Sequence, residues 1–389
     1  MRNLIPVGDY RFPADIINHF FSQFCGTNPV ELLFGRNLNG AFTSHRILGI
    51  PEIKIQKNPS LQQGLVETTM RSCREYNLTG MFSVREIVTS RGTLQYRNEH
   101  YTGLTCRISP DRLKRQIDQP FQLNSNPDGC PFCRDSVMTV TPTFPDGSRI
   151  IRGESVTFPN LFPFGAGHIV TVMTCEHSVV EFSRQQVVNS LLSQIEALRP
   201  VDGFPSINWN FLPSAGASLV HPHMQGLSDS HPSHIVDIYR SANDLYCRNP
   251  GMNYWDAVRD QEWTSDRYLF GDEILWSAHA VPVGEREVRG ILPISTLDEM
   301  ENYVDLVAEG ILEIISLYRE LGTHAFNMSL FFDKAGCNRG FRAFCSMISR
   351  INPNPSSMSD SAFMERLHLE PVIMTLPEEL GKFYKKVKN

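Results

Sequence analysis

Two histidines one residue apart carry the clearest chemical potential in this sequence, His221-Pro222-His223, and Met224-Gln225 follow them. If the segment is extended, side chains two residues apart point to the same face, so His221, His223 and Gln225 would share one face. An imidazole can attack phosphorus, bind a metal or carry a proton, and a neighbouring amide can hold a phosphoryl oxygen. The segment therefore suggests a histidine that accepts a nucleotidyl group. The alternative is two surface histidines around a proline turn.

Cys130 and Cys133 form a Cys-x-x-Cys pair that can grip one tetrahedral zinc ion if other residues complete the coordination. His177 and His221 are the candidates for the remaining ligands. A site closed by four protein ligands would be structural, and it would fix the segment that positions His223. The alternative is a redox pair, which usually has a thioredoxin-like setting that is not seen here.

Two further segments could contact a nucleotide. Arg112 and Arg115 are three residues apart and can point together, and guanidinium groups suit phosphate oxygens. A basic cluster of this kind is more often a solvated face. The stretch 158–163, Phe-Pro-Asn-Leu-Phe-Pro, offers an amide and aromatic rings to a nucleobase, and its alternative is a turn at the edge of the core.

The elements that must position these residues fall into two similar halves. In the first half we expect strands at 149–158, 168–174, 207–212 and 218–225, and a helix that starts at a capping box, Ser183 to Gln186. The helix's apolar stripe comprises Val188, Leu191, Leu192, Ile195 and Leu198.

The second half repeats this order, with strands expected at 287–294, 327–332 and 342–348. Its helix starts at a second capping box, Thr296 to Glu299, and its apolar stripe comprises Val304, Val307, Ile311, Ile314 and Tyr318. The composition of 231–267, between the halves, predicts an irregular connection with a short helix, in which His231 and His234 are surface residues or support a site indirectly. The pattern indicates a duplicated unit, and the alternative is two unrelated α+β stretches.

Composition limits the classes of function. The chain has 389 residues, a formal net charge of −6 and 41% hydrophobic residues, which fits a globular protein and gives no reason to expect a nucleic-acid partner. No apolar run approaches the roughly 20 residues of a membrane helix, and the first residues lack the pattern of a signal peptide. The nine cysteines are an odd number and mostly scattered, so we expect a reducing compartment, by default the cytoplasm.

From Arg97 onward the chain resembles galactose-1-phosphate uridylyltransferase and its relatives in the histidine-triad superfamily. The motifs occur in the family's order and at similar intervals. They are Arg97-Asn98, Thr102-Gly103, Ser109-Pro110-x-Arg112-x-x-Arg115, Cys130-Pro131-Phe132-Cys133, Pro159-Asn160-x-Phe162-Pro163, Gly167-His168, His177-Ser178, Asn210, and Gly216-Ala217-Ser218-x-x-His221-Pro222-His223-x-Gln225.

The resemblance implies an α+β fold of duplicated histidine-triad-like αβ units with antiparallel sheets, plus an N-terminal extension. The expected domains are an extension at 1–94, a catalytic half with the zinc site at 95–265 and a degenerate half at 266–389. The resemblance also implies a dimer, by family habit alone.

By position in the resemblance, His223 would be the nucleophile and Gln225 would hold the phosphoryl oxygens. The family's phosphate-binding positions fall on Arg112 and Arg115. Its nucleotide-pocket positions fall on Asn160, Phe162, Asn210, Gly216 and Ser218. Its structural zinc ligands fall on Cys130, Cys133, His177 and His221. The implied substrates are a nucleotide sugar as donor and a sugar 1-phosphate as acceptor.

The second half departs from the family pattern. The stretch 342–346, Arg-Ala-Phe-Cys-Ser, stands where the family usually has a histidine-x-histidine strand, and Ile373 falls near the place of an expected glutamine. The acceptor is therefore the open part of the prediction. The runner-up is a phosphorylase that uses inorganic phosphate as acceptor and an NDP-sugar or a dinucleoside polyphosphate as donor. A hydrolase, or a zinc-stabilised protein that binds nucleotides without catalysis, ranks below both enzymes.

Overall fold

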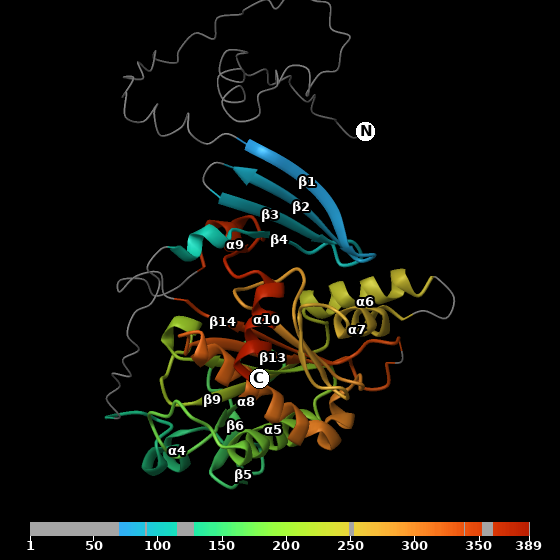
Figure 1. Cartoon of the computed structure of the whole chain (residues 1–389). Helices are drawn as coiled ribbons and strands as arrows, with labels where there is room; N and C mark the ends of the chain where they lie inside the picture. The colour runs from blue at the N-terminus through green and yellow to red at the C-terminus, as the bar shows by residue number, and fades with distance from the viewer. Residues whose placement is uncertain are drawn as a thin grey trace, which may run out of the picture. The chain divides into compact units, whose positions relative to one another are not determined.

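The computed structural model describes residues 70–89, 92–114, 128–248, 253–337, 339–351 and 361–388 (Figure 1). The chain divides into two compact units, Met1–Arg74 with Glu86–Thr93, and Glu75–Arg85 with Leu94–Asn389. In the described part of the smaller unit, Arg74 pairs with Glu86 at 2.5 Å. Most of the predicted N-terminal extension lies outside the described residues, so the domain boundaries at 94 and 265 stay predictions.

A ten-stranded sheet in the larger unit carries the predicted chemistry. Its order is β10-β11-β12-β14-β13-β8-β9-β7-β6-β5. The strands are β5 Ile150–Arg152, β6 Ser155–Pro159, β7 Gly167–Val172, β8 Phe204–Phe211, β9 His223–Asp229, β10 Tyr268–Phe270, β11 Leu275–Ala278, β12 Val288–Ile291, β13 Phe326–Phe331 and β14 Phe344–Ser349. All the pairings described between neighbouring strands of this sheet are antiparallel.

The order of this sheet shows the duplication directly. Each half has three consecutive strands, then a long helix, then two strands that pair with each other, and the last strand always lies next to the third. The two halves meet where β8 pairs with β13, with Asn210 opposite Asn327. The predicted α+β class and the duplicated αβ unit are therefore confirmed.

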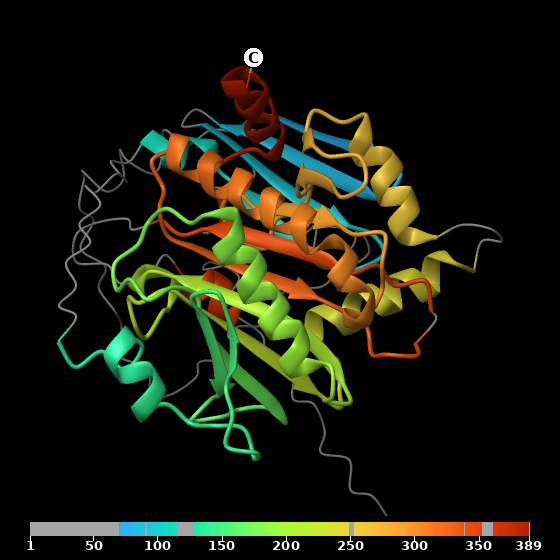
Figure 2. The ribbon, with the colours of Figure 1, turned by 90° about the horizontal axis from the view of Figure 1, so that it is seen from below.

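The two long helices, α5 Arg184–Leu198 and α8 Val304–Glu320, lie side by side over one face of this sheet (Figure 2). Their apolar stripes enter the main core, where Leu191, Ile195, Ile311 and Ile314 are fully buried. The capping box of Ser183 and Gln186 is present at the start of α5. The second capping box opens a 3-10 segment, η3 Leu297–Tyr303, which runs into α8.

A second sheet of five strands has the order β1-β2-β3-β4-β15. Its strands are β1 Met70–Thr79, β2 Phe82–Thr89, β3 Gly92–Glu99, β4 Thr105–Ile108 and β15 Val372–Ile373. Strand β15 runs parallel to β4, which is an exception to the predicted antiparallel sheets. Ile373 is buried in this strand, opposite Ile108, and so it packs in an apolar core.

The remaining helical segments are α4 Arg134–Val140, α6 His234–Tyr246, α7 Tyr254–Trp263, α9 Phe363–Leu367, α10 Pro377–Lys388, η1 Pro110–Lys114 and η2 Pro213–Ala215. The prediction of one short helix between the halves was wrong, because α6 and α7 both form there. They bury Tyr239, Tyr254 and Trp255 against Phe344 of β14. His231 and His234 are exposed, as expected. Within the described residues, no helix is both long enough and apolar enough to span a membrane.

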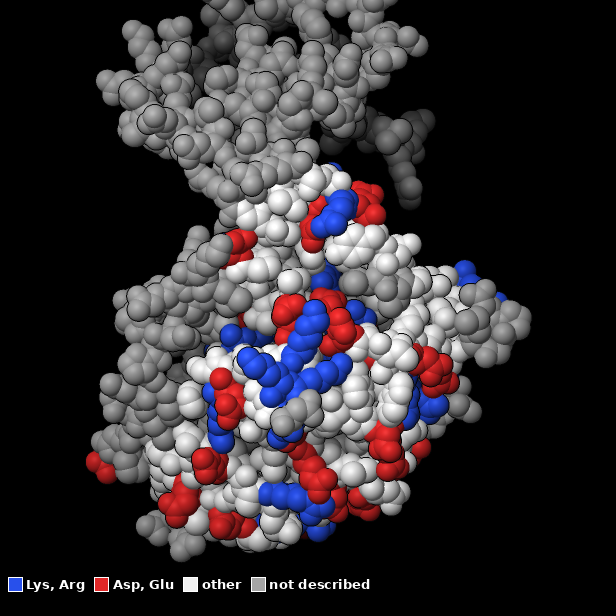
Figure 3. Space-filling view, viewed as in Figure 1, with Lys and Arg blue, Asp and Glu red and all other residues white. Residues whose placement is uncertain are grey.

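Two predicted strands were wrong in their limits. The strand expected at 149–158 is a hairpin of β5 and β6, because Gly153 takes a positive φ of 57° that turns the chain back. The strand expected at 218–225 begins only at His223, since 218–222 form a loop. Acidic and basic side chains are interspersed on the face of the described residues seen in Figure 3.

Candidate active site

His223 opens β9, with β7 on one side and β8 on the other, and only 5% of the residue is exposed. Its Nδ1 lies 2.8 Å from the backbone carbonyl oxygen of His221. A carbonyl oxygen only accepts, so Nδ1 carries the proton and Nε2 keeps its lone pair. Burial lowers the pKa of His223, against a smaller opposing effect of this hydrogen bond. The strand thus presents a neutral imidazole with a nucleophilic Nε2.

The four predicted metal ligands lie together. The ligand atoms of Cys130, Cys133, His177 and His221 are all within 4.8 Å of one another. The Cys133 Sγ lies 3.4 Å from the Nδ1 of His177, and both sulfurs lie 3.8 Å from the Nδ1 of His221.

These distances and donors fit a zinc ion. Bond lengths of about 2.3 Å to sulfur and 2.0–2.1 Å to nitrogen put neighbouring ligand atoms of a tetrahedron about 3.3–3.8 Å apart. The Nε2 of His221 donates to the carbonyl oxygen of Thr174 at 2.8 Å, which leaves its Nδ1 free to bind a metal. Burial also lowers the pKa of His221, which favours the neutral ring that metals bind.

Gln225 faces the same side of β9 as His223 and contacts His168 of β7. The Nε2 of His168 lies 3.0 Å from the Oε1 of Gln225 and 3.0 Å from the Nδ2 of Asn160. One ring nitrogen can donate to the first or accept from the second, but it cannot do both at once. The backbone N–H of Phe164 donates to the Nδ1 of His168 at 3.4 Å, so Nε2 carries the proton and donates to the Oε1 of Gln225.

Exposed aromatic rings border these amides. The loop after β6 carries Phe162, which is 81% exposed, and Phe164, which is 75% exposed. The rings of Phe164 and His168 meet edge-on, with their centroids 4.2 Å apart. The backbone N–H of Phe162 donates to the Oδ1 of Asn160 at 2.9 Å. Large exposed rings beside polar groups can stack on a planar base.

The turn after β8 leads back to the two histidines. Leu212 has a positive φ of 74°, an unusual conformation for leucine, and η2 follows it. Gly216 ends η2 with a φ of 85°, so a residue with a side chain would be strained there. Ser218 is exposed in the loop that follows.

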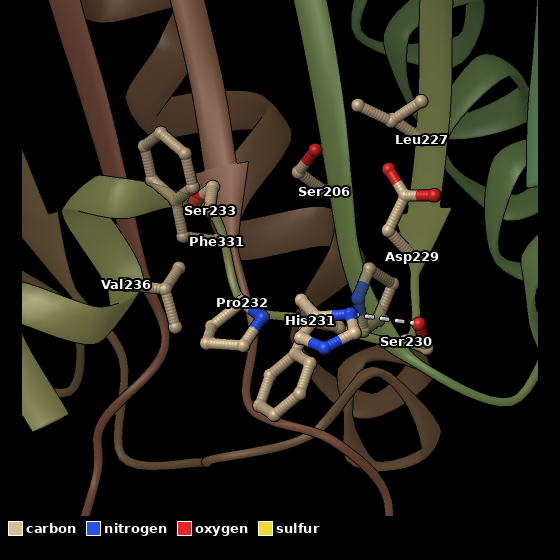
Figure 4. A pocket seen from close by; sticks show the side chains of 11 residues that line it. Ser206, Leu227, Asp229, Ser230, His231, Pro232, Ser233, Val236 and Phe331 are labelled. Atoms are coloured by element: carbon tan, nitrogen blue, oxygen red, sulfur yellow. Dashed lines mark hydrogen bonds between the residues drawn. The ribbon is translucent and has the colours of Figure 1, made fainter. Parts of the chain in front are cut away.

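A cavity of about 320 Å³ lies at the far end of β9. Figure 4 shows Leu227 and Asp229 of β9, Ser206 of β8 and Phe331 of β13 around it, with His231 at its mouth. Leu227 shares the face of His223 and Gln225, because the three residues alternate along one strand. Four residues of strand put Leu227 about 13 Å from His223.

Of the two predicted phosphate ligands, Arg112 and Arg115, the structure describes only the first. Arg112 is exposed in η1, and the described residues give its side chain no contact with the other candidates. Arg115 lies outside the described residues. Conversely, the sequence reasoning gave His168 no role, although it contacts Gln225. Its position next to Gly167 at the start of a buried strand was the available signal.

No family model matches the sequence. A protein of Archaeoglobus fulgidus, described as uncharacterized, is 27% identical over 307 residues, which cover 76% of this chain and 92% of that protein. Among solved structures, an ADP-glucose phosphorylase from Arabidopsis thaliana with bound ADP-glucose matches with a TM-score of 0.60 at 13% identity, over 75% of this chain and 99% of the other.

Two further structures agree. A GalT-like protein from Arabidopsis thaliana has a TM-score of 0.56 at 12% identity, over 67% of this chain and 92% of the other. A uridylyltransferase has a TM-score of 0.56 at 18% identity, over 75% of this chain and 97% of the other. These likenesses establish the fold.

Proposed function

We propose that this chain, which has the fold of the galactose-1-phosphate uridylyltransferase-like proteins, is an enzyme that moves a nucleoside monophosphate through a covalent intermediate on His223. One observation carries the proposal. The backbone carbonyl oxygen of His221 accepts a hydrogen bond from the Nδ1–H of His223, and so Nε2 keeps the lone pair that a nucleophile needs. The nearby amide of Gln225 supports this role, since phosphoryl oxygens need donors.

The transfer takes two displacements. The Nε2 lone pair attacks the α-phosphorus of the donor, a P–N bond forms, and the bond to the bridging oxygen breaks, so that the sugar phosphate leaves with the electron pair. An acceptor phosphate oxygen then attacks the same phosphorus, and the P–N bond electrons return to Nε2. Each displacement is easier than the direct exchange of two anions, which is the advantage of covalent catalysis.

Zinc would be held by Cys130, Cys133, His177 and His221, where it would supply structural cross-linking and no open coordination position. Because His221 is the residue whose carbonyl orients His223, this cross-link would fix the nucleophile. We expect Cys130→Ser to lose zinc, to unfold at a lower temperature and to lose most of the transfer activity. Metal analysis and a thermal melt test this. The exposed Cys247, changed to serine, is the control that should keep all three properties.

The leading acceptor is a sugar 1-phosphate, and inorganic phosphate is the second candidate. The second half of the chain favours inorganic phosphate, because the face of its sheet that would hold a sugar phosphate is filled by side chains of that half. Phe344 is fully buried, and Ser346 donates to Glu287, which pairs with Arg289 at 2.6 Å. An acceptor as small as phosphate needs no second sugar site, and the fold neighbour with bound ADP-glucose is named a phosphorylase.

The test is intact-mass spectrometry at mildly alkaline pH, where a phosphoramidate survives. The full chain is mixed with UDP-glucose, ADP-glucose and GDP-glucose separately, without an acceptor. We expect a mass gain of one nucleoside monophosphate that is absent in His223→Ala and present in His234→Ala, which changes an exposed histidine of α6. A chase with phosphate or glucose 1-phosphate then identifies the acceptor. An adduct that survives His223→Ala would refute the covalent mechanism.

A further inference from the structure

The seam between the two halves fixes the orientation of an amide beside the nucleophile. The pairing of β8 with β9 ends at Asn208 and Gln225, and the same register continued by two residues would bring Asn210 opposite His223 on the same face of the sheet. On its other side Asn210 pairs with Asn327 of β13.

The hydrogen bonds of Asn327 leave only one orientation for its amide. Arg350 Nη1 lies 2.8 Å from one end of this amide, and arginine can only donate, so that end is Oδ1. The carbonyl oxygen of Ala215 lies 2.7 Å from the other end and can only accept, so that end is Nδ2. A donor on one side and an acceptor on the other exclude the flipped amide.

The fixed amide of Asn327 then orients Asn210. The Nδ2 of Asn327 also donates to Asn210 at 2.6 Å, so the atom of Asn210 at the seam is its Oδ1. The Nδ2 of Asn210 is therefore the end of the amide that Asn327 does not hold, on the face of the sheet that also carries His223. Among the described residues it has no hydrogen-bond partner, and so its two protons are available to a ligand.

We propose that Asn327, contributed by the second half, is a positioning residue that holds the amide N–H groups of Asn210 toward the phosphoryl oxygens at His223. This rests on the proposed function. Asn327 also holds the carbonyl of Ala215, which anchors the strained turn between β8 and the histidines. The degenerate half thus completes the phosphoryl site of the other half.

The test is a double-mutant cycle on the rate of His223 nucleotidylation, measured by intact mass with the donor that labels the wild-type chain. We expect Asn210→Ala and Asn327→Ala each to slow labelling about 100-fold, as loss of a positioned donor does. We expect the double variant to be slower than Asn210→Ala by far less than 100-fold, because the interaction that both changes remove is lost only once and only the contact of Asn327 with Ala215 is lost in addition. Asn327→Asp should be as slow as Asn327→Ala, since a carboxylate turns the Asn210 N–H groups back to the seam.

Ser329→Ala is the matched control. It removes a neighbouring seam hydrogen bond, from Ser329 to the Oδ1 of Asn208, and leaves Asn210 oriented. Its effect on labelling should multiply with that of Asn210→Ala. If the effects of Asn210→Ala and Asn327→Ala also multiply, or if Asn327→Ala labels normally, the positioning role is refuted while the proposed function stands. If the wild-type chain forms no adduct with any donor, the proposed function fails and the role fails with it.

Discussion

His168 is the residue whose chemistry depends most on what its neighbours do. Its Nε2 is within 3.0 Å of both Asn160 and Gln225 and can satisfy only one of them. The backbone N–H of Phe164 donates to the Nδ1 of this ring at 3.4 Å, so Nε2 carries the proton and the partner that it satisfies is the Oε1 of Gln225. The ring therefore orients the amide of Gln225.

We expect His168→Phe to slow nucleotidylation of His223 about fivefold. Phenylalanine keeps the ring contact with Phe164 but removes the hydrogen bond to Gln225, and one such bond is worth about 1 kcal/mol. The labelling rate checks this, and the zinc content should be unchanged, because His168 contacts none of the cysteines. A labelling rate equal to that of the wild type would show that His168 only fills space.

At the scale of residues, the sequence identified the residue types of the candidate site but not which atom of each side chain would act. The spacing of His221 and His223 suggested a nucleophile beside a metal ligand, and the structure brings the four candidate ligands together. The choice of Nε2 over Nδ1 in His223 depends on a carbonyl in the loop before β9, and the orientation of Asn210 depends on Asn327, over a hundred residues away. Contacts of this kind leave no periodic pattern in a sequence, so sequence analysis cannot predict them.

At the scale of elements, one face of β9 packs closely against α5, while the opposite face carries the polar side chains of the candidate site. Gly226 lies between Gln225 and Leu227 and faces the helix. A Cβ there would lie 2.2 Å from the Oε1 of Gln194 and 2.7 Å from a side-chain carbon of Ile169. Gln194 is buried and donates to Thr171, so it cannot move aside freely.

We expect Gly226→Ala to lower the free energy of unfolding by about 1–3 kcal/mol, the usual cost of overpacking a core, and to slow labelling by displacing Gln225. Urea unfolding and the mass assay measure the two effects. Gly80→Ala is the control, because a Cβ there meets nothing within 4 Å. Equal stability of the two variants would contradict the packing argument.

The helices were easier to predict than the strands, for a local reason. The capping boxes of Ser183 and Thr296 and the 3.6-residue stripes are complete within each segment. The limits of β5 and β6 instead depend on Gly153, which turns the chain. The start of β9 depends on the loop 218–222, which carries His221. Only one short helix was expected where α6 and α7 form. The buried positions of α6 do have helical spacing, at Val236, Tyr239 and Tyr246, but the many polar residues of 231–267 outweighed that pattern.

At the scale of the whole larger unit, the two copies of the αβ unit have diverged in what covers them. In the second copy α6 and α7 close the face that would hold a ligand, around Phe344. In the first copy the equivalent face keeps His223, Gln225 and a cavity. The second copy still contributes through the seam, where Asn327 and Arg350 reach the first. The first copy therefore carries the candidate site, and the second copy supports it. This difference explains why the motif matches were strong in the first half alone.

The C-terminal helix is tied to both sheets by one carboxylate. Glu378 of α10 accepts from Arg97 of β3 at 3.0 and 2.8 Å and from Arg267, just before β10, at 3.0 Å. Burial alone would raise the pKa of Glu378, but the hydrogen bonds and charge of Arg97, with the charge of Arg267, lower it from 4.5 to about 2. The folded state therefore releases this proton more readily than the unfolded state.

The sign of the pH dependence follows from that difference. The contribution of Glu378 to stability is complete above about pH 4.5 and is lost as the pH falls toward 2, with a slope of up to about 1.4 kcal/mol per pH unit. We expect Glu378→Gln to be less stable than the wild type at pH 7 by on the order of 3 kcal/mol, because the buried Arg97 loses its carboxylate partner, whereas Arg267 keeps Glu262. The gap should shrink as the pH falls from 5 to 2.

Urea unfolding of both proteins at each pH measures this difference in stability, and loss of any metal at low pH affects both alike. Glu379→Gln, at the exposed neighbouring position, should match the wild type throughout, and a gap that is constant with pH would refute the role of the ionised carboxylate.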